Sequence, residues 1–126
     1  MSKTKVSKKY VDGFVLPLPK KNLEAYRQMA QKASRIWVEH GALEYRECVG
    51  EDLNVGFGTP FPKGIKTKTG ETVVFAYIVY KSRSHRDKVN AKIMKDPRIA
   101  AMCDPKAMPF YAKRMLYGGF ETLVEA

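Results

Sequence analysis

The sequence predicts an α+β fold of the ferredoxin-like type, with strands and helices in the order β-α-β-β-α-β. Three observations support this prediction. The 126 residues are enough for one domain with its own hydrophobic core, which we expect over residues 10–126. Segments with strand-like alternation and segments with helical periodicity follow one another in that order. One strand candidate is apolar on both faces, which indicates a sheet covered on both sides.

The first strand is expected at residues 10–18, where an aromatic and aliphatic run ends at Pro17 and Pro19, which cannot extend a strand ladder. A helix should follow with Asn22 as its N-cap. Its apolar positions recur at the spacing of one helical face: Leu23, Tyr26, Ala30, Ala33, Trp37 and His40. We expect Gly41 to end the helix because glycine accepts positive φ without steric cost.

Two further strands are expected at residues 43–50 and 72–81. The first of these alternates, with one wetter face, whereas positions 73–80 are apolar or aromatic without interruption. Between them, residues 51–70 are rich in Gly, Pro, Asn, Lys and Thr, and we expect a long irregular loop there.

The second helix is expected to run to about Lys95, with Ser82 or Ser84 as its cap; Asp87 at capping-box spacing favours Ser84. Asp96 and Pro97 should stop this helix and start another short turn. The last strand is expected at residues 113–120, where two consecutive glycines indicate a bulge or a close backbone approach.

Two helices would cover only one face of such a sheet, so the second apolar face needs a cover. We expect an identical sheet related by a two-fold axis, which would make a homodimer with an apolar interface. The alternative is that the loop at residues 51–70 folds back over this face.

Several long segments resemble a YbaA-like family of small bacterial proteins, and together they extend over nearly the whole chain after residue 9: residues 10–26, 39–50, 79–87, 90–98, 108–110 and 113–121. The resemblance implies a dimeric α/β barrel built from ferredoxin-like protomers. It implies no established activity. More distant relatives with that fold include cofactor-free monooxygenases, haem-degrading enzymes and small-molecule sensors. The haem-degrading pattern expects an Asn on the first strand, where this chain has Asp12.

The chain carries a formal net charge of +10, with four lysines and no acidic residue in positions 1–9. We expect these nine residues to form a disordered basic leader, and they lack the apolar region of a secretory signal. A second basic segment spans Lys81–Lys95 without interleaved aromatic residues, so we expect a solvated surface and no nucleic-acid partner. No segment is long and apolar enough to span a membrane. The separated Cys48 and Cys103 indicate a reducing, cytoplasmic protein whose thiols lie in the core.

Three residues are candidates for acid–base chemistry. His40 ends the apolar face of the first helix, where it would serve as a base at a pocket mouth or simply meet the last carbonyls of the helix. His85 lies among basic neighbours that should keep it neutral; it would face a pocket or belong to a solvated helix start. Asp12 interrupts an apolar strand, so we expect it to pair with Arg114 or Lys113, or to be a general base if unpaired.

Six residues are candidates for ligand binding. An aromatic set would line a pocket for a flat ligand between helix and sheet, although such residues more often belong to a plain core: Trp37, Tyr26, Tyr45 and Tyr77. Arg83, beside His85 at a helix start, would bind an anion, and Arg114 completes the set.

Nucleotide-binding, metalloprotease and serine-hydrolase motifs are absent, and two histidines with two separated cysteines do not make a zinc site, so we expect neither metal nor cofactor. The leading hypothesis is a cytoplasmic protein that binds a small organic ligand in a helix–sheet pocket and acts as a cofactor-independent, monooxygenase-like enzyme if it is an enzyme. The alternative is a non-enzymatic dimeric scaffold, or an anion- or RNA-binding accessory protein that uses the Lys81–Lys95 segment. The sequence identifies neither the ligand nor a reaction.

Overall fold

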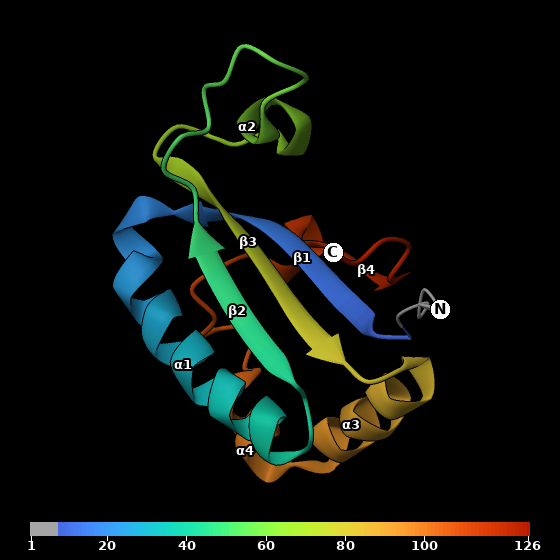
Figure 1. Cartoon of the computed structure of the whole chain (residues 1–126). Helices are drawn as coiled ribbons and strands as arrows, with labels where there is room; N and C mark the ends of the chain where they lie inside the picture. Colours follow the sequence, from blue (N-terminus) through green and yellow to red (C-terminus); the bar gives the residue numbers. More distant parts are fainter. Residues whose placement is uncertain (1–7) are drawn as a thin grey trace, which may run out of the picture.

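The computed structural model describes residues 8–126. Residues 1–7, which make up most of the expected leader, lie outside the described part of the chain. A four-stranded antiparallel sheet is covered on one face by helices (Figure 1). The strands are β1 (Tyr10–Pro19), β2 (Glu44–Val49), β3 (Glu71–Tyr80) and β4 (Leu116–Glu121). The helices are α1 (Leu23–Glu39), α2 (Phe61–Ile65), α3 (Arg83–Lys95) and α4 (Pro97–Met102), with short 3-10 turns at Lys20–Asn22 and Ala112–Arg114.

The strand order is β2-β3-β1-β4, which is the ferredoxin-like arrangement and confirms the predicted fold class. β1 and β3 pair along their whole length, from Tyr10 opposite Tyr80 to Pro19 opposite Glu71. β4 pairs with the first half of β1, and β2 forms the other edge against β3. The central pair is therefore made by the two most apolar strands, as their buried position requires.

Alternate residues of β1 and β3 point toward the helices and form the core, where Leu16, Val74 and Tyr80 are almost completely buried. One part of the core joins Tyr80 and Ile78 to α3 and α4. The other part joins Leu16 and Leu18 to α1. Tyr26, Ala30 and Ala33 of the predicted helical face pack on the sheet, whereas Leu23 is exposed and Ile36, which the prediction left out, is buried.

Local capping signals differ in part from the prediction. Gly41 does follow α1 with φ 119°, as expected for a glycine at that position. Ser82, and not Ser84, caps α3 by accepting a hydrogen bond from the backbone N–H of His85. Asn22 makes no side-chain cap; its amide donates to the carbonyl of Pro109 at 2.8 Å. Asp96 caps α4 as predicted, by accepting from the backbone N–H of Arg98.

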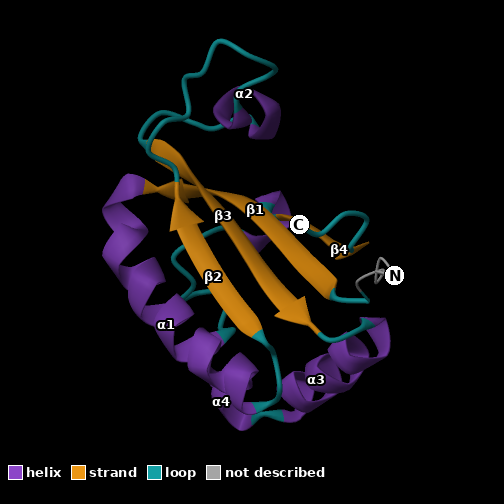
Figure 2. Ribbon diagram, in the orientation of Figure 1, coloured by secondary structure: helices purple, strands orange, loops and turns teal. Residues whose placement is uncertain are grey.

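Three further expectations are corrected. The 51–70 segment contains the short helix α2, which stands beyond the ends of β2 and β3 (Figure 2). The last strand begins at Leu116 because residues 112–114 form a 3-10 turn. Cys48 and Cys103 are exposed and are not core thiols.

Among residues 8–126, no segment covers the central part of the sheet face opposite the helices. Its exposed apolar side chains come from β3 and β4, with Phe75 45%, Leu116 58% and Phe120 61% exposed. Only the end nearest α2 is covered, where Val73 is buried. The 51–70 segment therefore does not cover this face, and the alternative to a partner is wrong for the central part of the sheet.

Within the described part of the chain, no helix has the length and apolar character that a membrane span requires.

Candidate functional site

A cavity of about 240 Å³ lies between the helices and the sheet. Its walls are almost entirely apolar or aromatic, and four of its lining residues are methionines: Met29, Met102, Met108 and Met115. Flexible thioether side chains adapt to occupants of different shape. The cavity therefore has the composition of a site for a small, mostly apolar molecule.

An open groove of about 430 Å³ adjoins the cavity along α1 and β2. Three residues line both spaces: Tyr26 on α1, and Tyr45 and Glu47 on β2. Arg27, Gln31 and other polar residues line the groove alone, which makes it wetter than the cavity. The three shared residues thus lie at the border between the apolar cavity and the open groove.

Glu47 is the centre of this boundary. Its Oε1 accepts a hydrogen bond from the Tyr26 hydroxyl at 2.5 Å, and its Oε2 accepts one from the Tyr45 hydroxyl at 2.8 Å. Burial raises the pKa of Glu47 above its ordinary value, although the two tyrosine hydrogen bonds act in the opposite direction. Desolvation also raises the pKa of both Tyr26 and Tyr45, so both hydroxyls remain protonated donors at neutral pH.

Glu47 was not among the predicted site residues, although the alternation of residues 43–50 puts it on the same strand face as Tyr45. This shared face is the signal that could have identified Glu47, because it lies two positions after a tyrosine that is predicted to point toward the helix. Its second donor, Tyr26, belongs to a helix 21 positions earlier, and only the folded chain reveals that contact.

Three of the four aromatic candidates come together at the cavity. Tyr26, Tyr45 and Trp37 line it, and the ring centroids of Trp37 and Tyr45 lie 6.0 Å apart. The indole N–H of Trp37 donates to the hydroxyl of Tyr80 at 3.1 Å, which fixes the ring plane. Tyr77 lies on the opposite face of the sheet, where its hydroxyl donates to Glu44 at 3.0 Å.

The two arginine candidates lie away from the cavity. Arg114 forms an ion pair with Glu71 at 2.6 Å and donates to the carbonyl of Lys66, so it ties the end of the sheet to the segment after α2. Arg83 is largely exposed, with Asp87 3.9 Å away.

Asp12 is buried at the other end of the sheet, and its partner is Arg86 on α3, with Oδ1 3.5 Å from Nε. The predicted pairing with Arg114 or Lys113 is therefore wrong. Desolvation raises the pKa of Asp12, with the Arg86 charge acting against it. The guanidinium of Arg86 also donates to the Tyr10 hydroxyl at 3.1 Å and lies over its ring. Asp12 lines neither the cavity nor the groove, and its ion pair joins the sheet to α3.

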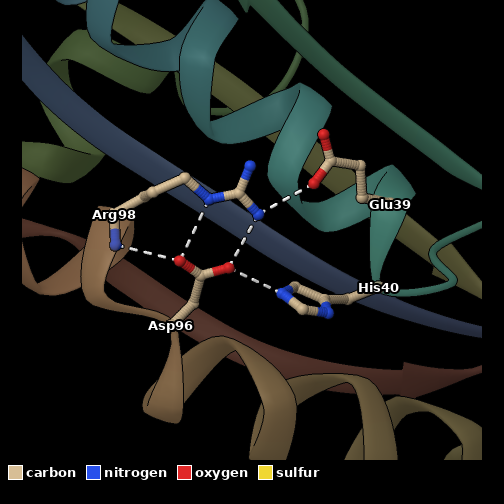
Figure 3. Close-up of polar contacts among 4 residues, drawn as sticks. All are labelled: Glu39, His40, Asp96 and Arg98. Atoms are coloured by element: carbon tan, nitrogen blue, oxygen red, sulfur yellow. Dashed lines mark hydrogen bonds and ion pairs between the residues drawn. The ribbon is translucent and has the colours of Figure 1, made fainter.

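His40 does not line the cavity; its ring contacts Asp96, the N-cap of α4 (Figure 3). Its Nε2 lies 2.7 Å from Oδ2 of Asp96, whose carboxyl also accepts from the backbone and side chain of Arg98. Glu39 pairs with the same guanidinium at 2.8 Å. Hydrogen bonds from Arg98 and His40 hold the pKa of Asp96 far below its usual range. This network joins the end of α1 to α4, and α4 in turn forms part of the cavity wall.

His85 does not face the cavity. Its Nδ1 accepts the backbone N–H of Lys81 at 2.9 Å, which requires an unprotonated Nδ1. Burial, followed by the charges of Lys81, Lys92 and Lys88, lowers its pKa. The predicted neutral histidine therefore closes the turn before α3, as a structural acceptor.

Among residues 8–126, no three His, Cys, Asp or Glu side chains lie close enough together to hold a metal ion.

A protein-family model described as "Protein of unknown function (DUF1428)" matches residues 9–112 of the chain. Proteins named "Uncharacterized protein YbaA" from Escherichia coli (strain K12) and Shigella flexneri are each 44% identical over 117 residues, which is 93% of this chain and 98% of the relative. The crystal structure of a dimeric ferredoxin-like protein from an uncultured marine organism superposes with a TM-score of 0.60 at 12% identity. That alignment covers 94% of this chain and 98% of the other, and it shows a shared fold.

Proposed function

Since the chain belongs to the DUF1428 family, as its resemblance to YbaA-like sequences predicted, we propose its function from the geometry of the site: it binds a small, largely apolar organic molecule in the cavity between the helices and the sheet. The observation that carries the proposal is Glu47, a carboxyl group held by two tyrosine hydroxyls at the border of an otherwise apolar cavity. Ligand sites typically combine such an apolar wall with a few oriented polar groups.

The size of the cavity supports a ligand of about one ring with a short substituent. A dry cavity of roughly 150 Å³ holds a benzene molecule, and this cavity measures about 240 Å³. A larger ligand would extend past Glu47 into the adjoining groove.

Glu47 is also the residue on which catalysis in this cavity would depend. A general base works best when its pKa lies close to the operating pH, and burial shifts the pKa of Glu47 in that direction. A cofactor-independent reaction that removes a proton from the bound ligand would use this carboxyl as the acceptor.

The proposal includes a homodimer in which the open sheet faces of two copies meet. Its support is the exposed apolar surface formed by Phe75, Leu116 and Phe120, together with the dimeric ferredoxin-like protein of similar fold. We propose no binding role for the basic side chains of α3. Arg86 is turned inward to Asp12, and the remaining lysines form a solvated surface of the ordinary kind.

The test uses Trp37, the single tryptophan of the chain, which lies in the cavity wall. We expect 2-phenylethanol to change its emission in a saturable manner, and Ala76→Leu to abolish this change, because Ala76 lines the cavity and the larger side chain fills it. Circular dichroism would establish that the variant is folded. Saturable binding that Ala76→Leu leaves unaltered, or no binding to the wild type, would contradict the proposal.

A further inference from the structure

We infer that the ligand of the helix–sheet cavity carries a protonated amine, which forms an ion pair with Glu47. This inference rests on the proposed function, because it assigns a chemical class to the molecule that the cavity binds.

Glu47 has no positively charged partner among residues 8–126. Three other carboxylates of low exposure each have an arginine partner: Asp12 pairs with Arg86, Glu71 with Arg114 and Asp96 with Arg98. Glu47 itself is half-buried. Among the described residues, no Lys, Arg or His side chain forms an ion pair with Glu47, whose hydrogen-bond donors are both neutral phenols. A half-buried carboxylate without a cation loses part of its hydration, which is costly unless something else compensates its charge.

Glu47 also has unused capacity to accept hydrogen bonds. An ionised carboxylate offers about four acceptor positions on its two oxygens. Tyr26 occupies one position on Oε1 and Tyr45 one on Oε2, so each oxygen can accept a further donor. An alkylammonium group has up to three N–H donors and brings the missing positive charge with them.

Aromatic side chains line the cavity together with Glu47. Tyr45 and Trp37 lie side by side in the cavity wall, and the ring of Phe110 packs edge-on against Tyr26 with centroids 5.6 Å apart. Rings grouped around a carboxylate attract an organic cation through their electron-rich faces, and this attraction increases when water is excluded.

The same arrangement disfavours the other ligand charges. An anionic ligand would bring a second negative charge to a carboxyl that has no cation beside it among the described residues. A neutral alcohol could donate one hydrogen bond, but it would leave the buried charge uncompensated. The order of affinity should therefore be amine, then alcohol, then carboxylate.

The experiment compares three probes that share one phenyl ring: 2-phenylethylamine, 2-phenylethanol and 3-phenylpropionate. Titrations follow Trp37 emission at pH 8, where an alkylamine, like lysine, is still protonated. We expect the amine to bind about tenfold more tightly than the alcohol, in line with a charge-assisted hydrogen bond, and the carboxylate to bind most weakly.

The variant Glu47→Gln keeps the side-chain shape and removes the charge, so it should reduce the preference for the amine over the alcohol to about one. Glu51→Gln removes the same charge from an exposed position outside the cavity and should preserve the preference. Equal or tighter binding of the alcohol by the wild type would overturn the amine assignment and leave the binding proposal intact. Binding of none of the three probes would overturn both. Because the wild-type comparison needs no variant, poor folding of Glu47→Gln would not prevent a decision.

Discussion

The hydroxyl group of Tyr26 on α1 donates a hydrogen bond to Oε1 of Glu47 on β2, with the two oxygens 2.5 Å apart. This contact joins the longest helix to an edge strand and places a carboxyl group at the border of the cavity. The other carboxylate oxygen is held by Tyr45 from the same strand. Two hydrogen bonds from different elements therefore hold the side chain of Glu47 in place.

Removal of the Tyr26 hydroxyl should destabilise the protein. Tyr26→Phe keeps the ring but leaves Glu47 with one donor fewer in a desolvated position, so we expect a loss of about 1–2 kcal/mol in the free energy of unfolding. Urea denaturation at neutral pH measures this. Tyr111→Phe removes a hydroxyl from a residue that is 60% exposed and should change stability little. Equal stability of the two variants would argue against an energetic role for the contact.

Glu47 should also give the stability a specific pH dependence. Because its pKa is raised in the folded state, the native protein retains the Glu47 proton at pH values where the unfolded chain has lost it. The stabilisation from that proton is complete below the unfolded pKa of about 4.3, and it is lost as the pH rises from there through the folded pKa.

The measurement is the difference in unfolding free energy between the wild type and Glu47→Gln across this pH interval. Asp12, whose pKa is also raised, changes both proteins equally and cancels in the difference. We expect the wild type to lose stability relative to the variant as the pH rises. A constant difference, or one of opposite sign, would show that the folded pKa of Glu47 is not raised.

Gly119 should not tolerate a side chain. A Cβ atom at this position would overlap the hydroxyl of Tyr10 and lie 2.8 Å from Nη2 of Arg86, which are the groups around the buried Asp12 pair. We expect Gly119→Ala to cost about 1–3 kcal/mol, as forced overpacking does. The control is Gly64→Ala, where a Cβ meets no other atom within 4 Å. Thermal unfolding compares the two, and a Gly119→Ala protein as stable as the control would refute the close approach.

The sheet face should control oligomeric state. Wild-type protein should sediment as a dimer, and Leu116→Lys should sediment as a monomer because it places a charge on the exposed apolar face. Phe57→Lys is the control, since Phe57 is 92% exposed within the 51–70 segment and lies off this face. A monomeric wild type, or a Leu116→Lys variant that remains dimeric, would disprove dimerisation through the sheet.

Much of the fold could be predicted because strand alternation and helical periodicity are local properties of the chain. The uninterrupted apolar positions 73–80 predicted a strand with two apolar faces, which is β3, and the periodicity of residues 23–40 placed Tyr26 on the buried face of α1. Gly118 and Gly119 suggested a close backbone approach, and Gly119 makes one with Tyr10.

Contacts between distant segments could not be predicted, since they depend on register and on how helices lie over the sheet. Tyr77 was grouped with Tyr45, yet β2 and β3 pair with Tyr45 opposite Ile78, so Tyr77 faces the other way. The partner of Asp12 was sought on β4 but lies on α3. The contact between His40 and Asp96, separated by 56 positions, likewise needed the fold.

The most direct test of the binding proposal uses the methionine methyl groups as reporters. Met29, Met102, Met108 and Met115 line the cavity, whereas Met94 on α3 is 82% exposed and lies outside it. In ¹³C-methyl-methionine NMR spectra recorded with increasing 2-phenylethylamine, we expect the four cavity methyl signals to shift together with one saturation curve and the Met94 signal to stay in place. Cavity methyl signals that do not move at any probe concentration, or a shift confined to Met94, would contradict a ligand site between the helices and the sheet.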